Sequence, residues 1–130
     1  MTYKFTIVVP VYNEEDNLER VEKELSNYLN IAIVPTSILF VNDGSKDKSQ
    51  ALIEAICNRN DAFEYISFKE NRGLSAAIKA GFDHVDSELV GYIDSDLQTS
   101  PEDFNLLLKH IDSHELVTGV RADRKDSFVK

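Results

Sequence analysis

Short apolar blocks alternate along the chain with longer stretches in which apolar residues recur at helical spacing. The blocks are rich in β-branched residues and nearly free of charge, a pattern typical of strands buried on both faces of a parallel sheet. They predict strands at Phe5–Pro10, Ser37–Val41, Phe63–Phe68, Glu88–Asp94 and Leu116–Val120. The intervening stretches predict helices at Glu14–Asn30, from Ser45 or Asp47 to about Asn60, at Leu74–Val85, and after the Ser100-Pro101 pair.

Each predicted helix carries a stripe of apolar residues that we expect to face the sheet. The expected stripes are Leu18, Val21, Leu25, Tyr28 and Leu29; Leu52, Ile53 and Ile56; Leu74, Ala77, Ile78, Phe82 and Val85; and Phe104, Leu107, Leu108 and Ile111. Small residues around Gly81 leave room for close packing of the third helix. The alternation of strand and helix with short connections predicts an α/β fold: a Rossmann-like, mostly parallel sheet with helices on both faces.

The composition is that of one globular domain, with 42% apolar and 28% charged residues over 130 positions. Its 14 basic and 23 acidic residues give a net charge of −9, which argues against general binding of nucleic acid. A phosphate-bearing ligand therefore needs local compensation from a metal ion, a helix N-terminus or a few placed cations. The single cysteine, Cys57, excludes an internal disulfide and favours a reducing compartment.

Polar residues gather where the predicted strands end. The five clusters are Pro10-Val-Tyr-Asn-Glu14, Asn42-Asp-Gly-Ser45, Asn71-Arg-Gly73, Asp94-Ser-Asp-Leu-Gln98 and Gly119-Val-Arg121. The carboxyl ends of parallel strands meet along one rim of a sheet, and open α/β sheets bind ligands at that rim. We therefore expect these clusters to form one site.

Asp94, Asp96 and Gln98 alternate along the chain, so an extended backbone would present three oxygen donors on one side. Carboxylate and amide oxygens suit Mg²⁺ or Mn²⁺. An acidic strand end that caps the next helix would have the same appearance, but Ser100 and Pro101 already supply a helix start. The pattern thus favours a divalent-metal site.

Tyr12, Glu14, Asp43 and Arg72 have side chains suited to contact a nucleotide. Tyr12 offers an aromatic face to a base, and Glu14 or Asp43 can accept hydrogen bonds from a ring N–H or from ribose hydroxyls. Arg72 can reach a phosphate where Gly73 permits close approach of the backbone. Structural alternatives exist for three of them: a packed ring for Tyr12, a turn and helix cap for Asp43, and a solvated loop arginine for Arg72.

Other nucleotide-binding and metal-binding patterns fail. The sequence has no Gly-x-Gly-x-x-Gly after the first strand and no Gly-x-x-x-x-Gly-Lys-Ser/Thr loop, which leaves a dinucleotide-binding Rossmann domain unsupported and excludes a P-loop NTPase. His110 and His114 have helical spacing but lack a third zinc ligand. Arg121, Arg124 and Lys125 form a basic patch that could bind a second phosphate or could be a solvated tail.

Taken together, these segments resemble family 2 glycosyltransferases of the GT-A fold. The resemblance rests on Val9-Pro-Val-Tyr-Asn-Glu-Glu15, Val41-Asn-Asp-Gly-Ser45, Asn71-Arg-Gly-Leu-Ser75, Asp94-Ser-Asp-Leu-Gln98 and Val117-Thr-Gly-Val-Arg121. The run Asp-Leu-Gln before Ser-Pro-Glu, with the later Gly-Val-Arg-Ala-Asp-Arg, is most similar to the polyprenyl-phosphate branch of the family. That branch includes dolichol-phosphate mannose synthases and undecaprenyl-phosphate sugar transferases.

The resemblance implies a role for each candidate residue. Asp94 and Asp96 would bind a Mg²⁺ or Mn²⁺ ion that bridges the diphosphate, joined by Gln98. Arg121 corresponds to a family arginine near the acceptor phosphate, so Asp96 and Arg121 are the expected catalytic residues. The nucleoside would be held by Pro10, Tyr12, Glu14 and Asp43.

The implied reaction is inverting transfer of a sugar from a UDP- or GDP-linked donor to an acceptor, with a polyprenyl phosphate expected. Because family members continue well past this length, we expect residues 1–130 to be the N-terminal, nucleotide-sugar-binding part of the catalytic domain. The whole protein would work at the cytoplasmic face of a membrane, touching it only through later segments, with this part soluble. A non-catalytic nucleotide-sugar-binding module and a family 2 transferase acting on a glycan hydroxyl are the alternatives.

Overall fold

A computed structural model describes residues 3–95, 100–109 and the backbone of 120–121. Strands and helices alternate along the chain, as the pattern predicts. The elements are β1 (Phe5–Val11), α1 (Leu18–Ile31), β2 (Thr36–Asn42), α2 (Ser49–Arg59), β3 (Phe63–Ser67), α3 (Leu74–His84), β4 (Leu89–Tyr92), α4 (Asp103–Lys109) and β5 (Val120–Arg121). The strands form one five-stranded sheet in the order β3-β2-β1-β4-β5, and every neighbouring pair is parallel. The α/β prediction is confirmed.

Two element boundaries differ clearly from the prediction. Helix α1 begins at Leu18 and not at Glu14, because the preceding residues form a turn in which Glu14 O accepts hydrogen bonds from the backbone N–H groups of Asn17 and Leu18. The last strand consists of Val120–Arg121, while residues 116–119 of the expected strand lie outside the described part of the chain.

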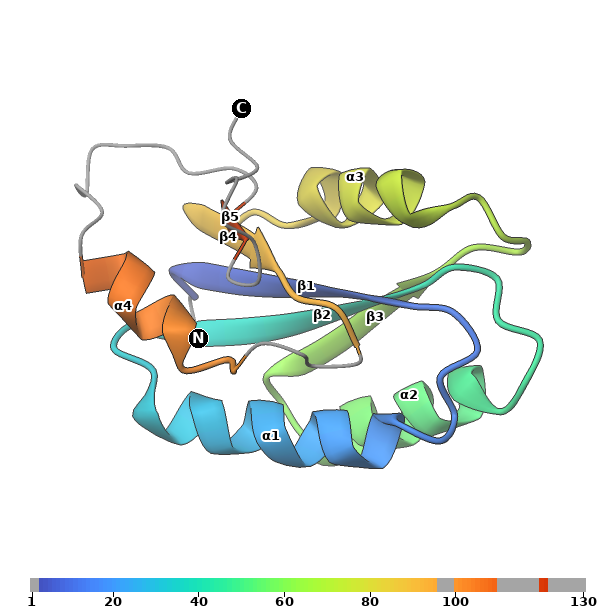
Figure 1. Ribbon diagram of the computed structural model, residues 1–130, viewed down its shortest axis with the longest axis horizontal. Coiled ribbons are helices and arrows are strands. Elements are labelled where there is room, and N and C mark those ends of the chain that lie inside the picture. Colours follow the sequence, from blue (N-terminus) through green and yellow to red (C-terminus); the bar gives the residue numbers. More distant parts are fainter. Residues whose placement is uncertain (1–2, 96–99, 110–119, 122–130) are drawn as a thin grey trace.

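The sheet is covered by helices on both faces, with α1, α2 and α4 on one side and α3 on the other (Figure 1). Alternate residues of β1 serve the two faces, as the period of an extended strand requires. Phe5, Ile7 and Val9 belong to the core under α1, α2 and α4, whereas Val8 belongs to the core under α3. The central strands are therefore buried on both faces, which explains their uninterrupted apolar sequences.

Helix α3 lies close to the sheet at Gly81, as the small residues of that segment predict. A Cβ added at this position would meet Val8 Cγ1 at 2.6 Å and Val41 Cγ2 at 3.2 Å. A valine in a buried strand has little rotamer freedom with which to retreat. The missing side chain of Gly81 thus allows the helix to settle directly onto β1 and β2.

Helix α4 is held against the end of α1. The Phe104 ring lies 5.3 Å from Phe5 and 6.3 Å from Tyr28, measured between ring centroids. The Tyr28 hydroxyl donates a hydrogen bond of 3.0 Å to Asn105 Oδ1. Burial of Tyr28 raises its pKa to about 12, so the hydroxyl remains a donor throughout the physiological pH range.

Three leucines expected in buried stripes are exposed: Leu52 and Leu107, each at 37%, and Leu74 at 53%. In α2 the inward positions belong to Ile53 and Ile56, and Leu52 is rotated by about 100° from Ile53 on the helix. In α4 the buried position is Phe104, while Ile111 lies outside the described residues. Among the described residues, no helix combines the length and the apolar character needed to cross a bilayer.

Candidate functional site

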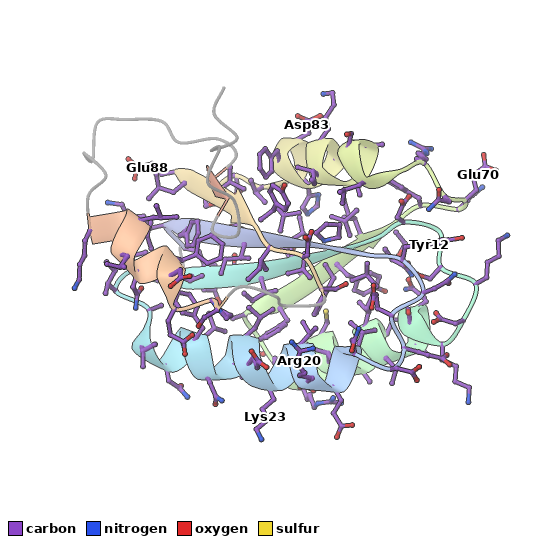
Figure 2. All side chains as sticks on the ribbon, in the orientation of Figure 1. Tyr12, Arg20, Lys23, Glu70, Asp83 and Glu88 are labelled. Atoms are coloured by element: carbon purple, nitrogen blue, oxygen red, sulfur yellow. The ribbon has the colours of Figure 1, made fainter. Side chains whose placement is uncertain are left out.

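The chain reverses its direction of travel across the sheet between β1 and β4. Strands β2 and β3 extend from β1 on one side, and the chain then returns to place β4 on the other. Such a switch point leaves a crevice at the carboxyl ends of the strands. A cavity of about 320 Å³ lies at this end, lined by Pro10, Val11, Tyr12, Glu14, Asp43, Asn71, Gly73, Leu74, Asp94 and Ser95. The loops after β1, β2 and β3 gather at this end, at the right of Figure 1, and Tyr12 is labelled there in Figure 2.

Pro10 lies where β4 leaves its pairing with β1. The register of the two strands ends at Val8 with Tyr92, and Ile93 N donates to Val8 O at 3.1 Å. Pro10 lies two residues after Val8, so its backbone nitrogen faces the same neighbouring strand, β4. Among the described residues, β4 has no further residue paired with β1 at that point. A proline costs no ladder hydrogen bond there. It instead marks the point at which the crevice opens.

The mouth of the cavity has two exposed apolar side chains. Tyr12, directly after β1, is 42% exposed, and Leu74, the first residue of α3, is 53% exposed. The expectation that Leu74 belongs to the buried stripe of its helix is wrong. The first turn of α3 lies beyond the covered part of the sheet, whereas Ala77, Ile78 and Gly81 are buried and Phe82 and Val85 pack against the same core.

Asp43 is buried at 4% exposure, and its carboxylate organises the loop between β3 and α3. Its Oδ1 accepts the backbone N–H of Arg72 at 2.7 Å, and its Oδ2 accepts that of Gly73 at 3.0 Å. Oδ2 also accepts a hydrogen bond from Asn71 Nδ2 at 3.0 Å. The negative charge therefore lies at the N-terminus of α3, where the helix dipole stabilises it. The Asp43 side chain therefore fixes the loop that leads into α3 and does not cap the helix that follows its own strand.

The backbone and the side chain of Arg72 have different partners. Its N–H is bound by Asp43, but its guanidinium carbon lies 4.7 Å from the centroid of the Phe68 ring, a cation–π contact. Arg72 is not among the residues that line the cavity. The structure thus brings the loop of Arg72 to the site and stacks its charged group on Phe68.

The predicted metal ligands are described in part. Asp94 is half-buried and lines the cavity together with Ser95, whereas Asp96 and Gln98 lie outside the described residues. Within the described ranges, no three His, Cys, Asp or Glu side chains converge as metal ligands would. The backbone register places Arg121 beside Tyr92, two residues before Asp94.

The described lining of the cavity is acidic. It contains the carboxylates Glu14, Asp43 and Asp94, and no lysine or arginine among the described lining residues. The carboxylate of Asp43 is compensated by N–H donors, and that of Glu14 accepts one hydrogen bond from Asn17 Nδ2 at 2.8 Å. A diphosphate placed in this cavity would meet like charge unless a cation accompanied it.

Residues 6–130 match the family model "Glycosyl transferase family 2". The chain belongs to glycosyltransferase family 2. It is 35% identical over 132 residues to the uncharacterized glycosyltransferase sll0501 of Synechocystis sp., an alignment that covers all of this chain and 42% of the relative. The resemblance to this family is therefore confirmed, while its polyprenyl-phosphate branch stays a prediction.

Solved glycosyltransferases share the fold. The mannosyltransferase PcManGT from Pyrobaculum calidifontis, in complex with GDP-Man and Mn²⁺, matches with a TM-score of 0.67 at 22% identity, over 84% of this chain and 32% of that one. S. aureus TarS 1–349 matches with a TM-score of 0.63 at 25% identity, over 85% of this chain and 33% of that one. TarS has also been solved with UDP and with UDP-GlcNAc. The chain spans less than half the length of these glycosyltransferases.

Five of the predicted site residues of this family 2 chain therefore line one cavity: Pro10, Tyr12, Glu14, Asp43 and Asp94. The cavity also includes Val11, Asn71, Gly73, Leu74 and Ser95, which are not among the predicted site residues. Most of these residues belong to the polar clusters of the sequence. Whole clusters therefore predict the lining of the cavity better than the individual residues predicted from them. Leu74 has no such signal, because its apolar side chain fits a buried stripe equally well.

Proposed function

We propose that residues 1–130 form the nucleotide-sugar-binding part of a metal-dependent, inverting glycosyltransferase. The observation that carries the proposal is the cavity between β1 and β4, where loops from four strands surround one space in a family 2 chain. The neighbours support a nucleotide-sugar ligand, because PcManGT is in complex with GDP-Man and TarS with UDP-GlcNAc. The donor of this chain would be a UDP- or GDP-linked sugar.

The nucleoside would bind at the mouth of the cavity. The exposed Tyr12 ring and the Leu74 side chain offer apolar surface to a base. Glu14 would accept a hydrogen bond from a ring N–H or a ribose hydroxyl. A carboxylate accepts about four hydrogen bonds, and Asp43 uses one position on Oδ1 and two on Oδ2 for the β3–α3 loop. Counting the donors in the described part of the chain, one acceptor position on Asp43 Oδ1 is therefore left for the ligand.

A divalent cation would be held by Asp94, Asp96 and Gln98. Carboxylate and amide oxygens suit Mg²⁺ or Mn²⁺, and the described lining of the cavity offers a diphosphate no lysine or arginine. PcManGT, which shares the fold, is in complex with Mn²⁺. When bound, the ion supplies charge stabilisation to the departing nucleoside diphosphate.

The acceptor would be a polyprenyl phosphate. This rests on the run from Asp94 to Glu102 and on the Gly119-Val-Arg-Ala-Asp-Arg124 segment, which resemble that branch of the family. Arg121 would hold the acceptor phosphate, and its backbone lies beside the end of β4. A phosphate oxygen is already ionised at neutral pH, so attack on the sugar needs no general base. Such a transferase would act at the cytoplasmic face of a membrane.

Calorimetric titration with UDP, GDP, UDP-GlcNAc and GDP-mannose, each with and without Mn²⁺, tests this proposal. We expect one nucleoside to be preferred and Mn²⁺ to strengthen its binding by about tenfold or more, equivalent to about 1.4 kcal/mol. The folded state is checked in parallel by circular dichroism. A folded protein that binds none of the four ligands in either condition would refute the proposal.

Tyr12→Ala should weaken nucleotide binding about tenfold, because contact between a base and an aromatic ring contributes about 1–3 kcal/mol. Leu74→Ala should weaken it by a smaller factor, because only apolar contact is lost. The matched controls are Tyr65→Ala and Leu106→Ala, which remove an exposed tyrosine and an exposed leucine that do not line the cavity. Equal losses in the variants and their controls would contradict the assigned base site.

A further inference from the structure

The loop after β1 and the loop after β2 hold each other through five hydrogen bonds, which we call the loop clasp. Each bond joins a backbone N–H of one segment to a side-chain oxygen of the other. The bonds are Asn13 N to Ser45 Oγ at 2.9 Å, Glu14 N to Ser49 Oγ at 2.9 Å, Glu15 N to Asp47 Oδ2 at 3.2 Å, Lys46 N to Asn13 Oδ1 at 2.8 Å, and Lys48 N to Glu15 Oε1 at 2.8 Å.

Three consecutive N–H groups of the β1–α1 loop, at residues 13, 14 and 15, donate to the β2–α2 segment. This fixes the path of the backbone directly after Tyr12. The path is an uncommon one, because Asn13 has a φ of +53°, in the left-handed region that few residues other than glycine and asparagine adopt readily. Asparagine tolerates this conformation, and the hydrogen bonds of the clasp hold the loop in it.

Asp47 is the centre of the clasp. While its Oδ2 accepts the N–H of Glu15, its Oδ1 accepts that of Ser49 at 2.9 Å, so one carboxylate ties the two loops together. Burial raises the pKa of Asp47, but hydrogen bonds from Ser49 and Glu15 outweigh this effect and hold the pKa below its usual range. Asp47 does not line the cavity.

The same β2–α2 segment holds the opposite wall of the cavity. Asp43 at its start binds the backbone of Arg72 and Gly73, next to Leu74. The β2–α2 segment therefore holds, through hydrogen bonds, both loops that present apolar side chains to the cavity. A change in Asp47 would release one wall and leave the other in place.

We propose that Asp47 is a positioning residue for nucleoside recognition: it fixes the loop that presents Tyr12 and Glu14 without touching the ligand. The inference rests on the proposed function, since it assigns that cavity to a nucleoside. Loosening of the β1–α1 loop would weaken the contacts of the base and ribose. The contribution of the metal ion depends on Asp94, on the other side of the crevice, and would not change.

The test compares Asp47→Ala and Asp47→Asn with the control Asp83→Asn. Asp83 is a 67% exposed residue of α3 that does not line the cavity, and its replacement removes the same charge as Asp47→Asn. We expect both Asp47 variants to bind the preferred nucleotide about tenfold more weakly, the equivalent of one hydrogen bond to a charged group. The factor by which Mn²⁺ strengthens binding should match that of the wild type, and Asp83→Asn should bind normally.

Stoichiometry and amide exchange separate positioning from general destabilisation. Partial unfolding would lower the number of binding sites, whereas loosening of the loop leaves that number unchanged and lowers the affinity. Exchange at the amides of residues 13–15, measured without ligand, should be faster in Asp47→Asn than in Asp83→Asn. If Asp47→Ala does not fold, Asp47→Asn alone decides.

Wild-type nucleotide affinity in a folded Asp47→Asn protein would overturn the inference. If the wild type binds neither UDP nor GDP, the proposed function fails, and the exchange experiment then decides on the clasp by itself. Faster exchange at residues 13–15 in Asp47→Asn supports the positioning of this loop by Asp47. Unchanged exchange overturns it.

Discussion

Replacing Asp94 by alanine is expected to abolish the strengthening of nucleotide binding by Mn²⁺ while the fold persists. Asp94 follows β4 directly and lines the cavity, and it is the described member of the proposed ligand pair with Asp96. Loss of one partner from a desolvated charge pair costs about 2–5 kcal/mol, more than the roughly 1.4 kcal/mol of a tenfold effect, so we expect the whole Mn²⁺-dependent gain of about tenfold or more to be lost. Calorimetric titration with the preferred nucleotide, with and without Mn²⁺, measures this loss of affinity.

The control is Asp61→Ala, which removes an exposed aspartate between α2 and β3, at the opposite end of the sheet. Thermal unfolding of both variants establishes that they are folded. Asp96→Ala should behave as Asp94→Ala does, because both carboxylates are proposed to bind the same ion. If Mn²⁺ still strengthens nucleotide binding in folded Asp94→Ala, this residue is not a metal ligand.

The fold follows from the hydrophobic pattern because both faces of the sheet are covered. The middle of β2, residues 38–41, is apolar at every position, and these side chains can all be buried only between two layers of helices. That requirement also places the polar loops at one rim, since parallel strands all end there. The order of the strands could not be predicted in this way, because the hydrophobic pattern does not show on which side of β1 the fourth strand pairs.

Positions at element ends were harder to predict than those in the middle. Leu74 continues the apolar spacing of Ala77 and Ile78, but it belongs to the first turn of its helix, beyond the sheet that would cover it. Helical spacing describes a face, and it does not say where the neighbouring layer stops. The same reason makes Leu74 available to the cavity.

The clasp was not predictable for another reason. Ser45 and Asp47 are residues typical of helix caps, and the sequence predicts them as such. Asp47 Oδ1 does accept the first N–H of α2, but its second oxygen binds Glu15, 32 residues earlier in the chain. The residue type shows that a side chain can accept a hydrogen bond, but only the tertiary structure shows which group donates it.

Gly44→Ala is expected to lower the free energy of unfolding by about 3–5 kcal/mol, from backbone strain together with a steric clash. Gly44 has a φ of +72°, which alanine adopts with strain. A Cβ there would lie 2.3 Å from the carbonyl carbon of Glu70 and 2.4 Å from the nitrogen of Asn71. Both atoms are backbone, so no rotamer change can relieve the contact. Urea or thermal unfolding of the variant measures the loss.

Gly73→Ala separates strain from clash. Gly73 has φ 100° and ψ 161°, a region almost restricted to glycine, yet an added Cβ would have no neighbour within 4 Å. It should therefore cost only the strain, about 1–3 kcal/mol. The excess cost of Gly44→Ala then reports the close approach of the β2–α2 and β3–α3 loops, on which the bonds of Asp43 depend. If Gly44→Ala destabilises no more than Gly73→Ala, the two loops are not in close contact in solution.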